Sequence, residues 1–277
     1  MPDNFQAQSV ADLMTTEFVT CSGEATMGEI ALKFARGRVH AVIVLDERGR
    51  PAGIVSDFDL LAGPWLADDA ESVELMRNMT AAELMTSPLE TIGVAATAEQ
   101  AAARLRRLRL NHLLVTDEAG AAQGMISVSD LVEPFGRPPG DARTVQDVMS
   151  RAIVTCLPAT PVSSAARAMT ERRSRSVVVV DEAGRAVGIV TNFDLLSLYE
   201  HDRREHPVSE LMRTPLITAD PQMSLSDAAN LMIGEEVHRL VIIDPAGAGG
   251  APIGIVSTSD VVSAMIQESS VWQGGGS

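Results

Sequence analysis

The chain has few aromatic residues, only two cysteines, no long apolar run and far fewer basic than acidic residues. Its 22 Lys and Arg against 37 Asp and Glu give a formal net charge of −15. Binding a phosphate backbone needs clustered basic side chains, so this balance argues against nucleic acid. No run approaches the roughly 20 apolar residues that cross a bilayer, and no basic region precedes an apolar stretch at the start. We therefore expect a cytoplasmic protein.

The two cysteines are too few for a disulfide framework. They stand in matching phrases, Val19-Thr20-Cys21 and Val154-Thr155-Cys156, and we interpret both as small buried strand residues. Hydrophobic residues make up 45% of the chain and aromatic residues 3%. We therefore expect a core built from Val, Ile, Leu, Ala and Met.

One phrase occurs four times: glycine, two apolar residues, a hydroxyl residue, two variable residues and aspartate. It starts at Gly53, Gly124, Gly188 and Gly254, at intervals of 71, 64 and 66 residues. The chain is therefore four copies of one motif of roughly 60 residues, near the lower limit for a self-sufficient core. Motifs of this size are expected to pair.

Each motif has the same order of patterns. An acidic residue and a methionine open it, as in Asp12-Leu13-Met14, and a short β-rich phrase and an amphipathic helix follow. A continuously apolar strand such as Val42–Leu45 predicts burial on both faces. It ends in a tight turn whose glycine is expected at positive φ, and the repeated phrase returns as the next strand before a last helix. The predicted class is α/β, with four β-α-β-β-α units.

The predicted domains are residues 9–66, 80–136, 144–201 and 207–269. Motifs 1 and 3 align without a gap across 10–61 and 145–196, which suggests duplication of a two-motif block and pairing of 1 with 2 and of 3 with 4. We expect a linker at 134–140, a solvated helix at 68–74, a Gly-rich insertion at 247–251 and a linker-like tail at 272–277.

These phrases, openings and turns resemble the CBS domain family, named after cystathionine β-synthase, over nearly the whole chain. The resemblance implies that two motifs pack through their strands into a Bateman module and that adenine nucleotides bind in the clefts between them. A four-motif chain resembles the regulatory γ subunit of AMP-activated protein kinase, in which two modules form a flat disc. AMP, ADP or ATP is the implied ligand, with no covalent cofactor.

The hydroxyl residue and the aspartate of each phrase allow two interpretations. At a strand-to-helix junction they form a capping box. They could also bind a nucleotide, with the carboxylate accepting hydrogen bonds from the ribose diol and the hydroxyl meeting a phosphate at the helix N-terminus. The pairs are Ser56 with Asp59, Ser127 with Asp130, Thr191 with Asp194, and Ser257 with Asp260.

The number and type of basic residues near the start of the second strand differ among the motifs. Motif 4 carries His238 and Arg239, motif 2 His112, motif 3 Arg175, and motif 1 His40. They could contact phosphate or cap a neighbouring helix. The threonines of the first strands could contact a base, although β-propensity explains them equally well; they are Thr20, Thr91, Thr155 and Thr218.

Neither a nucleophile constellation, metal-ligand spacing nor a Walker-type loop is visible in the sequence. We therefore expect a non-catalytic sensor that binds an adenine nucleotide as a monomer or homodimer and regulates an enzyme or transporter on another chain. The alternative is a structural or protein-interaction scaffold whose four phrases serve only as caps.

Overall fold

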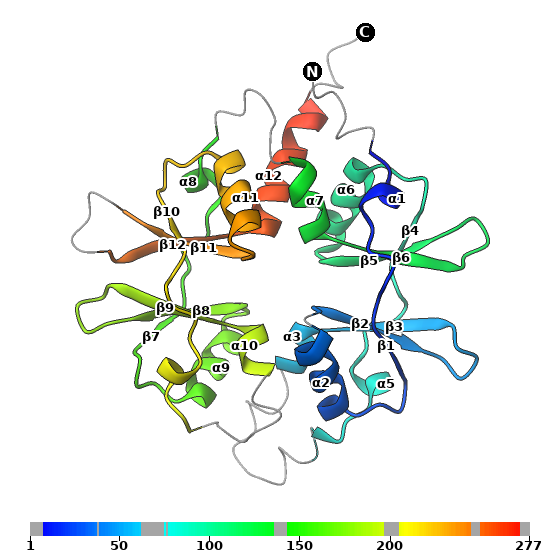
Figure 1. Ribbon diagram of the computed structural model, residues 1–277, viewed down its shortest axis with the longest axis horizontal. Coiled ribbons are helices and arrows are strands. Elements are labelled where there is room, and N and C mark those ends of the chain that lie inside the picture. Colours follow the sequence, from blue (N-terminus) through cyan, green and yellow to red (C-terminus); the bar gives the residue numbers. More distant parts are fainter. Residues whose placement is uncertain are drawn as a thin grey trace. The chain divides into compact units, whose positions relative to one another are not determined.

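The computed structural model describes residues 8–37, 39–61, 75, 77–135, 143–196, 205–244 and 250–271. Within them each motif forms one three-stranded sheet. The first strand is parallel to the second, and the second is antiparallel to the third. One helix follows the first strand and another follows the third (Figure 1). The predicted α/β architecture of four β-α-β-β-α units is confirmed.

Motifs 1 and 2 have corresponding elements. Those of motif 1 are β1 (Thr20–Ser22), α2 (Met27–Gly37), β2 (Ala41–Leu45), β3 (Pro51–Ser56) and α3 (Asp57–Leu61). Those of motif 2 are β4 (Thr91–Gly93), α6 (Ala98–Leu108), β5 (His112–Thr116), β6 (Ala122–Ser127) and α7 (Val128–Phe135). Thr20 pairs with Ile43 and Thr91 with Leu114, so the two sheets share one register.

Motifs 3 and 4 repeat this order. Motif 3 contains β7 (Thr155–Cys156), α9 (Val162–Glu171), β8 (Ser176–Val180), β9 (Ala186–Thr191) and α10 (Asn192–Leu196). Motif 4 contains β10 (Thr218–Ala219), α11 (Leu225–Gly234), β11 (Arg239–Ile243), β12 (Pro252–Ser257) and α12 (Thr258–Val271). The second strand of every sheet is buried along most of its length, as its continuous apolarity predicts.

The hairpin turns use glycine as predicted. Gly49, Gly120 and Gly184 have φ values of 74°, 80° and 79°, a region that residues with a Cβ atom rarely enter. The preceding aspartate fixes all three turns further, because Asp46, Asp117 and Asp181 accept hydrogen bonds from the backbone two and four residues later.

The opening segments pack on a motif other than the one that they precede. Helix α1 (Val10–Leu13) contacts α6 of motif 2, α5 (Ala81–Leu84) contacts β3 of motif 1, and α8 (Val145–Val148) contacts β12 of motif 4. After the 3-10 turn Val208–Glu210, Arg213 bridges to Ile189 of motif 3. Motifs 1 and 2, and motifs 3 and 4, thus exchange openings. The predicted pairing of motifs 1 with 2 and 3 with 4 stays a prediction, as do the domain bounds.

The exchange explains why glycine begins each repeated phrase. A Cβ atom at Gly188 would lie 2.6 Å from Sδ of Met212, and one at Gly254 would lie 2.5 Å from Sδ of Met149. Gly124 and Gly53 face Met14 and Met85 in the same way. The opening methionine therefore needs a strand residue without a side chain.

By its internal contacts the chain divides into two compact bodies. The 2–4 body comprises Met1–Glu17, Glu90–Ala152 and Ile217–Ser277, and the 1–3 body comprises Phe18–Leu89 and Ile153–Leu216. In the 2–4 body α12 packs on α7 and α6, and α11 packs on α7. In the 1–3 body α10 packs on α3 and α2. The sequence did not predict this helix-mediated association of motif 2 with 4 and of motif 1 with 3.

Some details differ from the predictions or lie outside the described residues. Pro134 and Phe135, expected in a linker, complete α7, because proline at that place interrupts only the helix end. Cys21 is buried as predicted, but Cys156 is only half-buried at the end of a two-residue strand. The segment 68–74, the rest of the linker, most of the insertion and the tail lie outside the described residues.

Candidate functional site

Each repeated phrase runs from the third strand of a sheet into the helix that follows. The first helical residue donates its backbone N–H to the residue just before or at the start of the second strand, at 3.0–3.2 Å; these pairs are Asp57 with His40, Val128 with Asn111, Asn192 with Arg175, and Thr258 with His238. This bond places the residue before the second strand beside a helix N-terminus, and that residue is basic in motifs 1, 3 and 4 but is Asn111 in motif 2. The backbone amides and the helix dipole there favour an anion.

The hydroxyl residue and the aspartate are joined in all four motifs. One carboxylate oxygen, Oδ2, accepts the backbone N–H of the Ser or Thr at 2.7–2.8 Å and its hydroxyl at 2.6–2.7 Å. The backbone part of this contact is that of a capping box. The capping interpretation therefore describes the observed contact, and ribose binding stays a prediction for all four pairs.

The other carboxylate oxygen distinguishes motif 3. Oδ1 of Asp194 accepts a hydrogen bond from Nε of Arg213 at 2.6 Å, and the Asp194 side chain is only 9% exposed. Among the described residues, Oδ1 of Asp59, Asp130 and Asp260 has no hydrogen-bond donor. At the place of Arg213 the other opening segments carry Thr15, Thr86 and Ser150, whose side chains are much shorter.

Asp130 lies in a desolvated environment. Burial raises the pKa of Asp130 above its ordinary value, against the opposing effect of the hydrogen bonds from Ser127. Loss of water disfavours the charged form, whereas hydrogen bonds to the carboxylate favour it. A ligand that donates hydrogen bonds to this carboxylate would favour the charged form further.

Two predicted phosphate contacts of the 1–3 body meet at a carboxylate that the sequence analysis missed. Asp57, only 6% exposed, lies 3.2 Å from Nδ1 of His40 through Oδ2 and 3.9 Å from Nη1 of Arg175 through Oδ1. The His40 ring also packs on Phe193, with ring centroids 5.4 Å apart. A protein carboxylate thus lies where an anionic ligand was expected to meet these cations.

Asn192 is the motif 3 counterpart of Asp57. It is 2% exposed, and neither polar atom of its side chain has a hydrogen-bond partner among the described residues. Buried side-chain polar atoms without a hydrogen-bond partner are rare. The missing signal was the residue directly after the hydroxyl, which the phrase treats as variable: Asp57, Val128, Asn192 and Thr258.

The corresponding junction of the 2–4 body carries no carboxylate at those positions, which hold Val128 and Thr258. His238 contacts Ser129 instead, with Nδ1 and Oγ 3.4 Å apart. His112 and Arg239 are the first residues of β5 and β11. The structure thus brings motif 4 residues next to α7 of motif 2.

In the part of the chain that the structure describes, every helix is too short or too polar to span a bilayer. In the same residues no group of three or more His, Cys, Asp and Glu side chains is arranged to hold a metal ion.

Comparison with known proteins identifies the repeated motif. The family model of the CBS domain matches residues 10–64, 81–135, 145–201 and 208–267. CBS domain-containing protein YhcV of Bacillus subtilis is 33% identical over 129 residues, which are 46% of this chain and 89% of YhcV. The 5'-AMP-activated protein kinase subunit gamma-3 of Homo sapiens is 29% identical over 136 residues, 45% of this chain but only 27% of that subunit.

A solved structure shares the fold over nearly the whole chain. Protein MJ1225 of Methanocaldococcus jannaschii, described as a candidate archaeal homologue of the kinase γ subunit, matches with a TM-score of 0.79 and 18% identity. The match covers 93% of this chain and 99% of MJ1225. Since the four family matches span most of its residues, the chain belongs to the CBS domain family.

Proposed function

We propose that the chain is a non-catalytic regulatory protein that binds an adenine nucleotide, AMP, ADP or ATP, at the strand-to-helix junctions of its CBS motifs. The ribose diol donates hydrogen bonds to the aspartate of the phrase, and the phosphate lies at the helix N-terminus beside the basic positions. The observation that carries this proposal is the carboxylate of Asp260, of which only Oδ2 accepts hydrogen bonds from the described residues, both from Ser257. Ser257 pairs with Arg239 across the sheet, and Thr258 donates its backbone N–H to His238. The similarity to a subunit of the 5'-AMP-activated kinase supports an adenine nucleotide.

The motifs differ in what already occupies their binding groups. Motif 4, with Ser257 and Asp260, and motif 2, with Ser127, Asp130 and His112, are the strongest sites. In motif 1, Asp57 neutralises the basic position, and in motif 3 Arg213 occupies Asp194. The nucleotide would therefore bind first in the 2–4 body.

Regulation follows if the nucleotide binds one arrangement of the chain better than another. The regulated enzyme or transporter would be a separate chain, and the protein would act in the cytoplasm as a monomer or homodimer. A ligand that contacts two motifs can change their arrangement only if its affinity for one arrangement exceeds its affinity for the other.

Isothermal titration with AMP, ADP and ATP tests the proposal. We expect binding to wild-type protein and at least about tenfold weaker binding to Asp260→Ala, since hydrogen bonds to a charged group contribute about 1.5–3 kcal/mol and 1.4 kcal/mol is tenfold. Ser224→Ala is the control, because Ser224 caps α11 without belonging to the phrase. Absence of heat and of thermal stabilisation with all three nucleotides would refute the proposal.

The alternative function, a protein-interaction scaffold, is favoured by the observed capping contacts, which satisfy the phrase without any ligand. It predicts a partner complex that persists in pull-downs and in the Asp260→Ala variant. Nucleotide would then leave both the stability of the protein and the amount of complex unchanged.

A further inference from the structure

Two pockets outside the repeated phrase share six corresponding lining positions. In motif 2 a cavity of about 380 Å³ lies between β4 and α6, and in motif 1 a cavity of about 960 Å³ lies between β1 and α2. The lining of the first is Ile92, Ala96, Gln100, Ala103, Arg104 and Arg107. Each has a counterpart 71 positions earlier in the second lining: Cys21, Ala25, Glu29, Leu32, Lys33 and Arg36. Their volumes are those of small-molecule sites.

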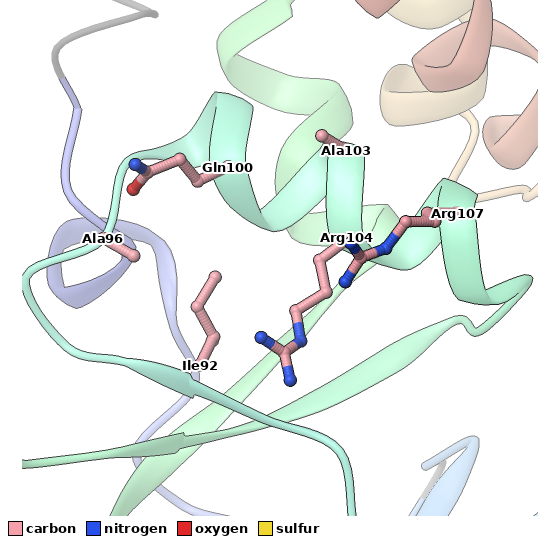
Figure 2. Close-up of a pocket in the computed structure, with 6 residues that line it drawn as sticks. All are labelled: Ile92, Ala96, Gln100, Ala103, Arg104 and Arg107. Carbon is pink, nitrogen blue, oxygen red and sulfur yellow. The ribbon is translucent and has the colours of Figure 1, made fainter.

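Both linings combine an apolar wall with two cations one helical turn apart. Figure 2 shows the Arg104 and Arg107 side chains extending from α6 to the same side, with the Arg104 guanidinium near the strand that carries Ile92. Lys33 and Arg36 occupy the same positions on α2. Residues at i and i+3 share a helix face, so each pair can bind one anionic group.

The cations keep hydrogen-bonding capacity. Arg104 binds Glu90 through Nη2 at 2.8 Å, but its buried Nε has no hydrogen-bond partner among the described residues. Within the same residues Arg107, Lys33 and Arg36 form no ion pair. Basic side chains that form no ion pair are unexpected in a chain with a net charge of −15, because acidic partners are abundant.

Two polar lining residues of the helices are engaged at the helix start, and the motif 1 lining also contains the carboxylate of Glu24. Glu29 accepts the backbone N–H of Thr26 at 2.8 Å, and Gln100 accepts that of Thr97 at 3.0 Å. Both side chains are thus held at the helix N-terminus as capping boxes.

Motifs 3 and 4 lack the basic pair. In the register of the sheets, Ala168 and Glu171 replace it in motif 3, and Leu231 and Gly234 replace it in motif 4. The shared fold alone therefore does not account for the cations. They are a property of motifs 1 and 2.

We propose that these pockets are a second class of ligand site, which takes a small organic anion with one carboxylate, sulfonate or phosphate group and an apolar body. The anion lies between the two cations, and the apolar body lies on the wall formed by the strand residue, the alanine before the helix and one helical residue, Ala103 in motif 2 and Leu32 in motif 1. The proposal does not depend on nucleotide binding at the repeated phrase.

The probe for both pockets is 8-anilinonaphthalene-1-sulfonate, with neutral N-phenyl-1-naphthylamine as the uncharged analogue. Fluorescence titration of the full chain in saturating AMP should show two anion sites. Arg104→Gln/Arg107→Gln and Lys33→Gln/Arg36→Gln should each weaken one site at least about tenfold, because charge-assisted hydrogen bonds are lost. Arg106→Gln/Arg109→Gln removes the same charge from an exposed position of α6 and from its exposed C-cap, both outside the lining, and should bind like wild type.

Lys33 offers an independent measurement because it is the only lysine of the chain. Reductive methylation with ¹³C-formaldehyde keeps its charge and gives one lysine signal, which should shift on addition of the sulfonate and not of the neutral analogue. The proposal is overturned if the pocket variants bind like Arg106→Gln/Arg109→Gln, if the neutral analogue binds equally well, or if the Lys33 signal stays unchanged.

Discussion

The two bodies place the same backbone junction in opposite electrostatic settings. In the 1–3 body a buried carboxylate, Asp57, lies between His40 and Arg175, and Arg213 occupies Asp194. In the 2–4 body the positions that correspond to Asp57 and Asn192 hold Val128 and Thr258, and Ser150 stands where the 1–3 body has Arg213. Repeated motifs can therefore keep their scaffold while single side chains change the charge at their junctions.

The scaffold itself should respond equally in both bodies. Gly254→Ala and Gly188→Ala place a Cβ atom 2.5–2.6 Å from a methionine Sδ and 3.2 Å from a backbone carbonyl oxygen. Overpacking of this kind costs about 1–3 kcal/mol, so we expect each variant to lose about 2 kcal/mol of unfolding free energy in urea denaturation. Gly93→Ala, where no atom lies within 4 Å, is the control. A large difference between the two variants would show that the bodies differ in packing as well as in charge.

Removing Arg213 should convert motif 3 toward the state of motif 4. Arg213→Thr introduces the residue that motif 1 has in Thr86 and removes the hydrogen bond from Nε of Arg213 to Oδ1 of Asp194. In an Asp260→Ala background, we expect about tenfold tighter AMP binding by isothermal titration, the effect of one charge-assisted hydrogen bond. The reciprocal Ser150→Arg should weaken binding in the 2–4 body.

A control variant distinguishes the loss of a positive charge from the loss of the hydrogen bond between Arg213 and Asp194. Arg172→Thr removes an exposed arginine of the same body and should leave the affinity for AMP unchanged. Equal effects of Arg172→Thr and Arg213→Thr would refute the assignment of Arg213 as the group that blocks motif 3.

The sequence predicted the fold well because the patterns that specify each helix, strand and turn lie within short stretches of every motif. The apolar strands, the turn glycines and the Ala-rich helices all repeat, and four copies confirm one another. The junctions were less predictable, since the contact of His40 with Asp57 and that of Arg213 with Asp194 join residues 17 and 19 positions apart in the chain. The ion pair of Asp57 with Arg175 joins two motifs through helix packing, which no local pattern contains.

Neutralising Asp57 should make the 1–3 body resemble the 2–4 body. Asp57→Asn removes a buried carboxylate from two cations, but His40 and Arg175 are each about a third exposed. Solvent screening therefore limits the loss of unfolding free energy to about 1 kcal/mol, and AMP affinity in the Asp260→Ala background should rise several-fold. Glu47→Gln, an exposed carboxylate of the same motif, is the matched control. Unchanged affinity in Asp57→Asn would show that Asp57 does not exclude the phosphate.

The smallest effect concerns pH and the 2–4 body alone. Because burial raises the pKa of Asp130, the folded protein holds this proton more tightly than the unfolded chain. The resulting stability is present below the unfolded pKa and is lost as pH rises through the folded pKa. Asp130→Asn should therefore flatten the pH dependence of urea unfolding just above the ordinary aspartate range. The variant and the wild type could instead show the same slope of unfolding free energy against pH in this range. That result would mean that desolvation of Asp130 does not cause the slope, because the hydrogen bonds from Ser127 offset the effect of burial on the pKa.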